Sequence, residues 1–193
     1  MSDHVVRGYM LVSTLDYIES PAFTDTQRQL VYSKLSPDVS RDRSAYDVMK
    51  WYPASHANEL NNGMAAVHGD DEQKVYDLLE GLGMFTADKA TSTFLRLIMK
   101  ILTPRLFARK APDFWARDNR IGRMESDISQ IDQKRMVVHL RDISPLSHVA
   151  PSAAGFAKFA LKAIGLKNLR VVTNGWSLKQ PAPDAVHFDI SWD

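Results

Sequence analysis

The sharpest local cluster of chemistry-bearing side chains runs from Asp113 to Arg120, in the order Asp-Phe-Trp-Ala-Arg-Asp-Asn-Arg. Guanidinium groups bind carboxylates and phosphates through paired hydrogen bonds, so Arg117 and Arg120 are candidate anion contacts. Trp115 is large enough to fill a pocket beside them. A simpler interpretation needs no ligand: a tight helix-to-strand corner, with Trp115 in the core and both arginines at its rim. The sequence alone favours this second interpretation.

The histidines do not have the spacing of a metal site. None pairs with another at i+3 or i+4, and the chain has no cysteine, so helical and thiolate metal motifs, disulfides and a Cys nucleophile are excluded. His139 and His187 fall in predicted strands and could meet across a sheet, either as a metal or catalytic pair or, more simply, as solvated strand residues. The full set is His4, His56, His68, His139, His148 and His187.

Other short motifs are too incomplete to indicate a reaction. Gly81 and Gly83 lack the remaining spacing of a phosphate-binding loop and are interpreted as a helix terminus. The acidic run 70–72 lacks the other ligands of an EF-hand and more simply stabilises a helix N-terminus. Ser152 and Ser177 have no nucleophile-elbow context. We therefore find no catalytic signature in the sequence.

The most apolar segment lies between Phe94 and Phe107. Its apolar side chains extend more than half way round a helix, which predicts burial on two sides. The simple interpretation is a central core helix. The functional interpretation is a helix that lines a closed cavity for an apolar ligand, because ligand pockets are mostly hydrophobic. The candidate pocket residues are Phe94, Leu97, Ile98, Ile101, Leu102 and Trp115.

The elements that must position these residues divide the chain into a mainly helical half, residues 1–110, and a hairpin–helix–hairpin half, residues 111–193. The alternation of apolar and polar residues from Val186 to Asp193 is typical of a strand with one buried face. The sequence predicts an α+β fold in one domain of residues 1–193: an N-terminal helical half packed on a four-stranded antiparallel sheet, with one crossing helix. The predicted helices are Val5–Glu19, Thr24–Leu35, Ala54–His68, Gln73–Leu82, Thr86–Phe107 and Ser152–Ile164, with the transition to strands beginning at Ala111-Pro112; the predicted strands are Arg123–Ile131, Arg135–Ile143, Leu169–Leu178 and Ala185–Trp192.

Composition limits the partner classes. The chain is 45% hydrophobic and 24% charged, as globular proteins are, and its 24 basic and 23 acidic residues nearly cancel. This balance gives no reason to expect nucleic acid or an anionic membrane as the main partner. The N-terminus lacks a signal-peptide pattern, and no apolar run approaches the ~18 residues of a membrane span. We expect a cytoplasmic protein.

The predicted order of elements resembles that of the superfamily of haem-nitric-oxide-binding (H-NOX) domains, 4-vinyl-reductase domains and small transport-complex subunits of Golgi tethers. The likeness is strongest from Arg135 to the end, where Met136-Val137-Val138-His139-Leu140 precedes a Gly-containing helix and two closing strands. The whole chain is similar to a paralogous family expanded in myxobacteria. The residues that carry this second likeness are Val6-Arg7-Gly8, Thr103-Pro104-Arg105-Leu106, Pro112, Phe114-Trp115, Arg117 and Asn119.

The departures from H-NOX domains bear on the cofactor. In that family a histidine on the helix before the first hairpin ligates haem, whereas here no histidine occurs between Val75 and Val138. The family's Tyr-x-Ser-x-Arg motif falls near residues 139–143, where Tyr and Ser are absent and only Arg141 remains as a candidate anion contact. Haem requires an axial ligand, so the resemblance implies no haem ligation of the H-NOX kind.

Three functional hypotheses follow. The first is a non-enzymatic sensory or regulatory domain that binds a small apolar ligand in a closed pocket and signals through a partner protein. The second is a protein-interaction or scaffold module without a ligand, using an exposed apolar patch or a homodimer interface that Trp51, Tyr52 and Trp176 would supply. The third, an enzyme, needs ionisable groups clustered in a cleft, for example His139 with His187 or Arg117 with Asp118.

Overall fold

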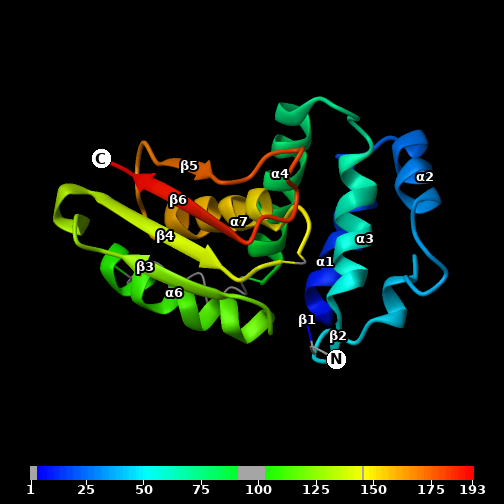
Figure 1. Ribbon diagram of the computed structural model, residues 1–193, viewed down its shortest axis with the longest axis horizontal. Helices are drawn as coiled ribbons and strands as arrows, with labels where there is room; N and C mark the ends of the chain where they lie inside the picture. Colours follow the sequence, from blue (N-terminus) through cyan, green and yellow to red (C-terminus); the bar gives the residue numbers. More distant parts are fainter. Residues whose placement is uncertain (1–3, 91–102, 145) are drawn as a thin grey trace.

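The computed structural model describes residues 4–90, 103–144 and 146–193 of the chain (Figure 1). The N-terminal half is mainly helical, with two short strands that pair antiparallel. A capping box at Thr24 begins the second helix, as the sequence predicts: Thr24 Oγ1 accepts the Gln27 amide, and Gln27 Oε1 accepts the Thr24 amide. These elements are β1 (Val5–Arg7), α1 (Gly8–Ile18), α2 (Asp25–Ser33), β2 (Trp51–Pro53), α3 (Ala54–Ala65) and α4 (Glu72–Ala90).

The C-terminal half contains one four-stranded antiparallel sheet in the order β3-β4-β6-β5. Its inner face is apolar because every second residue of the two central strands is buried, as at Met136, Val138, Phe188 and Ile190. This confirms the predicted α+β class and both predicted hairpin regions. The elements are α6 (Pro104–Asp118), β3 (Arg123–Asp127), β4 (Arg135–Arg141), α7 (Val149–Ala163), β5 (Arg170–Asn174) and β6 (Ala185–Ser191).

The helices form layers around the sheet. Helix α6 packs along β3, and α7 packs against β5 and α4. In Figure 1, α4 stands between the sheet with α6 and α7 on one side and α1, α2 and α3 on the other. Helix α4 therefore joins the N-terminal helices to the layer that covers the sheet.

Several predicted helix ends were wrong. The first helix begins at Gly8 and not at Val5, because Val5–Arg7 pair with β2 as strand β1. Helix α4 continues through Gly81 and Gly83 to Ala90, because these glycines allow close packing against Tyr17 of α1 and Ser152 of α7 and do not form a cap. Helix α6 continues through Pro112 to Asp118, where the sequence had predicted a transition to strands. Proline removes one helical hydrogen bond, but Ala108, Ala111 and Trp115 stay buried on one helix face, and this packing maintains the helix.

Helices α4 and α7 approach each other at two glycines. A Cβ atom on Gly83 would lie 1.9 Å from the Ser152 carbonyl oxygen, and one on Gly155 would lie 1.9 Å from the Glu80 carbonyl oxygen. Real Cβ atoms never come that close, so each glycine faces the backbone of the other helix. The pair is further fixed by the Ser152 hydroxyl, which donates to the Leu79 carbonyl oxygen at 3.1 Å.

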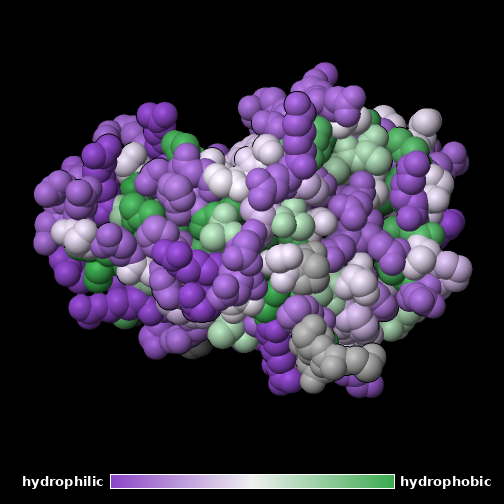
Figure 2. Space-filling model, in the orientation of Figure 1, coloured by the Kyte–Doolittle hydropathy of each residue, from purple (hydrophilic) through white to green (hydrophobic). Residues whose placement is uncertain are grey.

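The face of the molecule drawn in Figure 2 is largely polar. Figure 2 shows a mostly hydrophilic face on which apolar residues occupy small separate areas. Among the described residues, the exposed large hydrophobic side chains are Leu30, Val48, Met49 and Leu106. No helix within the described ranges is both long enough and apolar enough to cross a membrane.

Candidate functional site

The candidate site is a cavity of about 140 Å³ between the helices and the inner face of the sheet. Its wall is mainly apolar, and α1, α4, α6 and α7 supply most of it. Phe107, Phe114 and Trp115 line it from α6, Phe156 lines it from α7, and Phe188 lines it from β6. The cavity thus lies where the N-terminal helices meet the sheet layer.

One buried carboxylate lies on the cavity wall, and its charge is balanced within the protein. Tyr9 Oη donates to Asp118 Oδ2 at 3.0 Å, and Arg117 donates to both carboxylate oxygens, from Nε at 2.9 Å and from a terminal nitrogen at 2.6 Å. The Asp118 side chain is 9% exposed, whereas that of Arg117 is 51% exposed. We call Tyr9, Asp118 and Arg117 the carboxylate triad. Arg117 carries the opposite charge and remains accessible to water.

Tyr9 and Arg117 both have a pKa raised above its usual value. Burial, and then the Asp118 charge, raise the pKa of Tyr9 well above its usual value. The hydrogen bonds to Asp118 raise the pKa of Arg117. At neutral pH Tyr9 is therefore a neutral donor and Arg117 a cation, and Asp118 accepts three hydrogen bonds from them.

Other polar groups on the wall also donate to the protein. The Thr14 hydroxyl donates to the Met10 carbonyl oxygen at 2.9 Å, and the Asn61 amide donates to the Ser147 carbonyl oxygen at 3.1 Å. The Trp115 indole donates to the Ile121 carbonyl oxygen at 2.8 Å. The Thr14 hydroxyl and the Trp115 indole thus have no proton left for a ligand, and Asn61 keeps one amide proton. These three groups leave few free donors for a ligand, which disfavours an anionic one.

Removing the triad's bonds should lower stability in a coupled way. We expect Tyr9→Phe to cost about 1 kcal/mol and Asp118→Asn about 2 kcal/mol, because a charge-assisted hydrogen bond is lost in each case. The expected loss of stability for Asp118→Asn is small for a buried ion pair because water screens the half-exposed Arg117. Urea unfolding of both single variants and the double variant measures this. The double variant should lose less than the sum of the single losses; strict additivity would show that the two groups act independently.

The sequence-predicted site residues lie in several different environments. Trp115 is buried and lines the cavity. The three candidate anion contacts are not gathered at one point: Arg117 pairs with Asp118, Arg120 lies 4.3 Å from the Trp51 ring centroid, and Arg141 lies 3.6 Å from Glu125. Phe94, Leu97, Ile98, Ile101 and Leu102 fall outside the described residues.

Sequence reasoning paired Asp118 with Arg117 but missed Tyr9 and its bond to Asp118. Tyr9 and Asp118 are separated by 109 positions, so no local spacing could have indicated that they bond. The predicted meeting of His139 and His187 is confirmed: they are direct cross-strand partners with ring centroids 5.9 Å apart. Among the described residues no group of three or more His, Cys, Asp or Glu side chains could hold a metal ion.

The three aromatic residues of the scaffold hypothesis make separate internal contacts. The Trp51 ring is also covered by Arg7, whose guanidinium carbon lies 4.2 Å from the ring centroid. The Tyr52 hydroxyl accepts the Asp47 amide at 2.7 Å. Trp176 packs edge-on to Tyr76 with ring centroids 5.7 Å apart. These residues do not build one exposed apolar patch.

Comparison with solved structures identifies the architecture. A crystal structure of an Fe(II) unliganded H-NOX protein mutant from K. algicida matches with a TM-score of 0.71 over 97% of this chain and 96% of that chain, at 13% sequence identity. This chain has the H-NOX fold. An H-NOX protein from S. oneidensis in the Fe(II)NO state matches with a TM-score of 0.68, covering 97% of this chain and 99% of that one at 12% identity.

The match extends to a solution structure. The H-NOX from Shewanella woodyi in the Fe(II)CO state matches with a TM-score of 0.61, 12% identity, and coverage of 95% of this chain and 93% of that chain. No protein-family model and no curated protein sequence matches the chain. At these identities the likeness to H-NOX proteins establishes the fold, and the chemistry must be argued from this chain's own residues.

Proposed function

We propose that this chain is a non-enzymatic sensory domain that binds a small, neutral, apolar ligand in the cavity beside Trp115 and signals through a partner protein. The observation that carries the proposal is the cavity of about 140 Å³ with its mainly apolar wall. A cavity of similar size, about 150 Å³ and lined by Leu, Ile and Phe, is known to bind benzene or xenon. A location in the cytoplasm and membership of the myxobacterial paralogous family are parts of the same proposal.

We further propose that the ligand is not haem held in the H-NOX manner. The cavity wall, as far as the structure describes it, contains no histidine or cysteine, and the sequence has no histidine between Val75 and Val138. Tyr9 lines the cavity, but its hydroxyl is bonded to Asp118. Arg117, which could pair with a propionate, is already paired with Asp118. The residues present therefore do not fit a haem that needs an axial ligand and propionate partners.

The first test asks whether the purified protein carries or accepts such a ligand. Native mass spectrometry and an absorption spectrum are recorded on the protein as isolated, followed by titration with benzene monitored by methyl NMR signals. We expect the mass of a bound neutral molecule, or saturable changes in the NMR shifts of methyl groups that line the cavity. The absence of both would overturn the ligand proposal, and a Soret band from ligated iron would overturn the exclusion of haem.

The second test fills the cavity. Ala157 lies on the cavity wall in α7, and we expect Ala157→Phe to weaken benzene binding at least about tenfold because its ring takes the ligand's place. Ala163 is on the same helix and not among the lining residues, so Ala163→Phe is the matched control and should bind as the original protein does. Equal binding by both variants would place the benzene site elsewhere. Circular dichroism checks that each variant is folded.

A further inference from the structure

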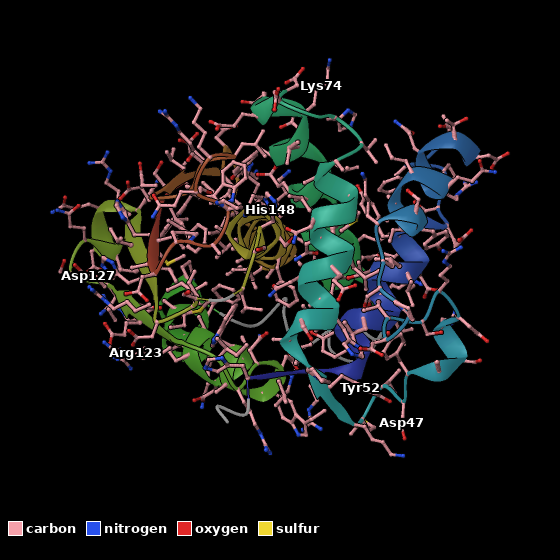
Figure 3. The ribbon with its side chains drawn as sticks, turned by 45° about the vertical axis from the view of Figure 1, so that its right-hand side comes forward. Asp47, Tyr52, Lys74, Arg123, Asp127 and His148 are labelled. Carbon is pink, nitrogen blue, oxygen red and sulfur yellow. The ribbon has the colours of Figure 1, made fainter. Side chains whose placement is uncertain are left out.

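The outer face of the sheet, opposite the cavity, carries four arginines in two different situations. Arg123 lies 2.5 Å from Asp142 and 3.3 Å from Glu125, and Arg141 also approaches Glu125. Arg135 and Arg170, in contrast, form no ion pair and no side-chain hydrogen bond with any described residue. Figure 3 shows Arg123 and Asp127 at the outer edge of the molecule on β3.

The two unpaired arginines flank one hydroxyl. Ser191 on β6 is the direct partner of Arg135 on β4 and of Arg170 on β5, so the three form one row across three adjacent strands. Residues in register on adjacent strands point to the same side of a sheet. Since neighbouring strands are about 4.8 Å apart, the two arginine backbones lie about 10 Å apart with Ser191 between them. Both guanidinium groups can therefore reach one small group above the Ser191 hydroxyl.

This row forms one end of an open groove of about 530 Å³. The next row of the groove contains Asp127 and Asp189, so the acidic groups face the same space. Each makes contacts away from the arginines: Asp127 accepts the Ser129 amide at 2.8 Å, and Asp189 accepts the Asn174 side-chain amide at 2.8 Å and lies 3.8 Å from His187. Within the described part of the chain, neither carboxylate forms an ion pair with Arg135 or Arg170.

We propose that Arg135, Ser191 and Arg170 form a binding site for a phosphate group. Two guanidinium forks and a hydroxyl supply several converging donors with a fixed positive charge, which is the arrangement that a tetrahedral oxyanion fills. The site lies on the face of the sheet opposite the apolar cavity, and it does not depend on the ligand proposed there. It would take a phosphorylated small molecule or a phosphate-bearing lipid headgroup.

The experiment titrates the whole chain with sodium pyrophosphate and follows backbone amide NMR shifts, with sodium chloride added to hold the ionic strength constant. We expect saturable shifts in β4, β5 and β6 near this row, and weakening of at least about fivefold in Arg135→Gln and in Arg170→Gln. Arg123→Gln removes an arginine from the same face that is already paired with carboxylates, so it is the matched control and should change affinity less than twofold. Absence of saturable shifts, or equal weakening by the control, would overturn the proposal.

A second arm distinguishes the source of the phosphate. Sedimentation with phosphatidylcholine vesicles that contain phosphatidic acid is compared between the original protein and Arg135→Gln. Vesicle binding that requires Arg135 would place the phosphate on a lipid. Pyrophosphate binding without vesicle binding would place it on a soluble molecule. Vesicle binding unaffected by Arg135→Gln, without a pyrophosphate site, would count against the proposal.

Discussion

Gly155→Ala should destabilise the fold by about 2 kcal/mol, the overpacking cost less the gain in helix propensity. The new Cβ would lie 1.9 Å from the Glu80 carbonyl oxygen and 3.1 Å from the Met84 amide nitrogen, and both are backbone atoms of α4. Backbone atoms cannot rotate away, so α4 and α7 must separate, and overpacking of a core commonly costs 1–3 kcal/mol. This cost exceeds the gain of about 1 kcal/mol that alanine brings over glycine inside a helix. Urea unfolding of the variant measures the difference.

The matched control for this prediction is Gly69→Ala. Gly69 has a positive φ of 56°, but nothing lies within 4 Å of its Cβ position, so only backbone strain of about 1 kcal/mol is expected. A loss in Gly155→Ala no greater than that of the control would show that the helices can separate without cost. Gly83→Ala should behave like Gly155→Ala, since its Cβ would meet the Ser152 carbonyl oxygen.

Acidification from pH 6.5 to pH 4 should remove about 3 kcal/mol of stability through His148. This side chain is 4% exposed, its Nδ1 has no hydrogen-bond partner, and Trp176 packs against its ring. Burial disfavours the charged form and lowers the pKa of His148 from 6.5 to about 4. Between these values the unfolded chain binds more protons than the folded one, so stability falls as pH decreases, by about 1.4 kcal/mol per pH unit.

The position of His148 explains why it stays neutral. Figure 3 places it in the interior beside α7, and its backbone amide donates to the Pro181 carbonyl oxygen at 2.7 Å. The neighbouring phenol of Tyr76, across Trp176, has its pKa raised to about 12 by burial and supplies no negative charge at acidic pH. Among the described residues, burial alone accounts for the lowered pKa of His148, with no contribution from an opposite charge.

The measurement is a series of urea unfolding curves between pH 4 and pH 8 for the original protein and for His148→Asn. His148 has a left-handed backbone with φ of 57°, which asparagine tolerates better than most residues, so this variant removes the titration with little strain. Surface carboxylates contribute equally to both curves and cancel in the difference. We expect the difference to change by about 3 kcal/mol across the window; parallel curves would assign the acid sensitivity to other groups.

Sequence patterns predicted those parts of the fold that depend on local periodicity. The strand alternation around Phe188 and the apolar face of the helix that includes Ala160 both correspond to observed elements. The errors at Gly83 and Pro112 have one physical cause. Both residues usually end helices, but here packing against a distant segment outweighs their local preference, and one sequence does not reveal that segment.

The candidate site was less predictable than the fold. The sequence indicated Trp115 as a pocket residue because large aromatic side chains often line pockets. The structure places Trp115 on the cavity wall. The carboxylate triad could not be found in this way, since Tyr9 reaches Asp118 only after α1 and α6 have packed. The sequence indicated Arg117 as an anion contact because of its positive charge. In the structure this side chain forms an ion pair with Asp118. Residue type therefore suggested candidates, while their partners depended on tertiary contacts.

The short strand β1 has a consequence for the order of folding. It pairs with residues 51–53 of β2, and its Val5 carbonyl oxygen accepts the Arg120 amide at 3.0 Å, so it is held by segments far along the chain. Contacts of such long sequence separation close slowly, because the intervening chain must first lose its freedom. During synthesis, β1 cannot complete these contacts until α6 has left the ribosome. The cavity wall formed by Val6 and Tyr9 should thus be among the last parts of the molecule to assemble.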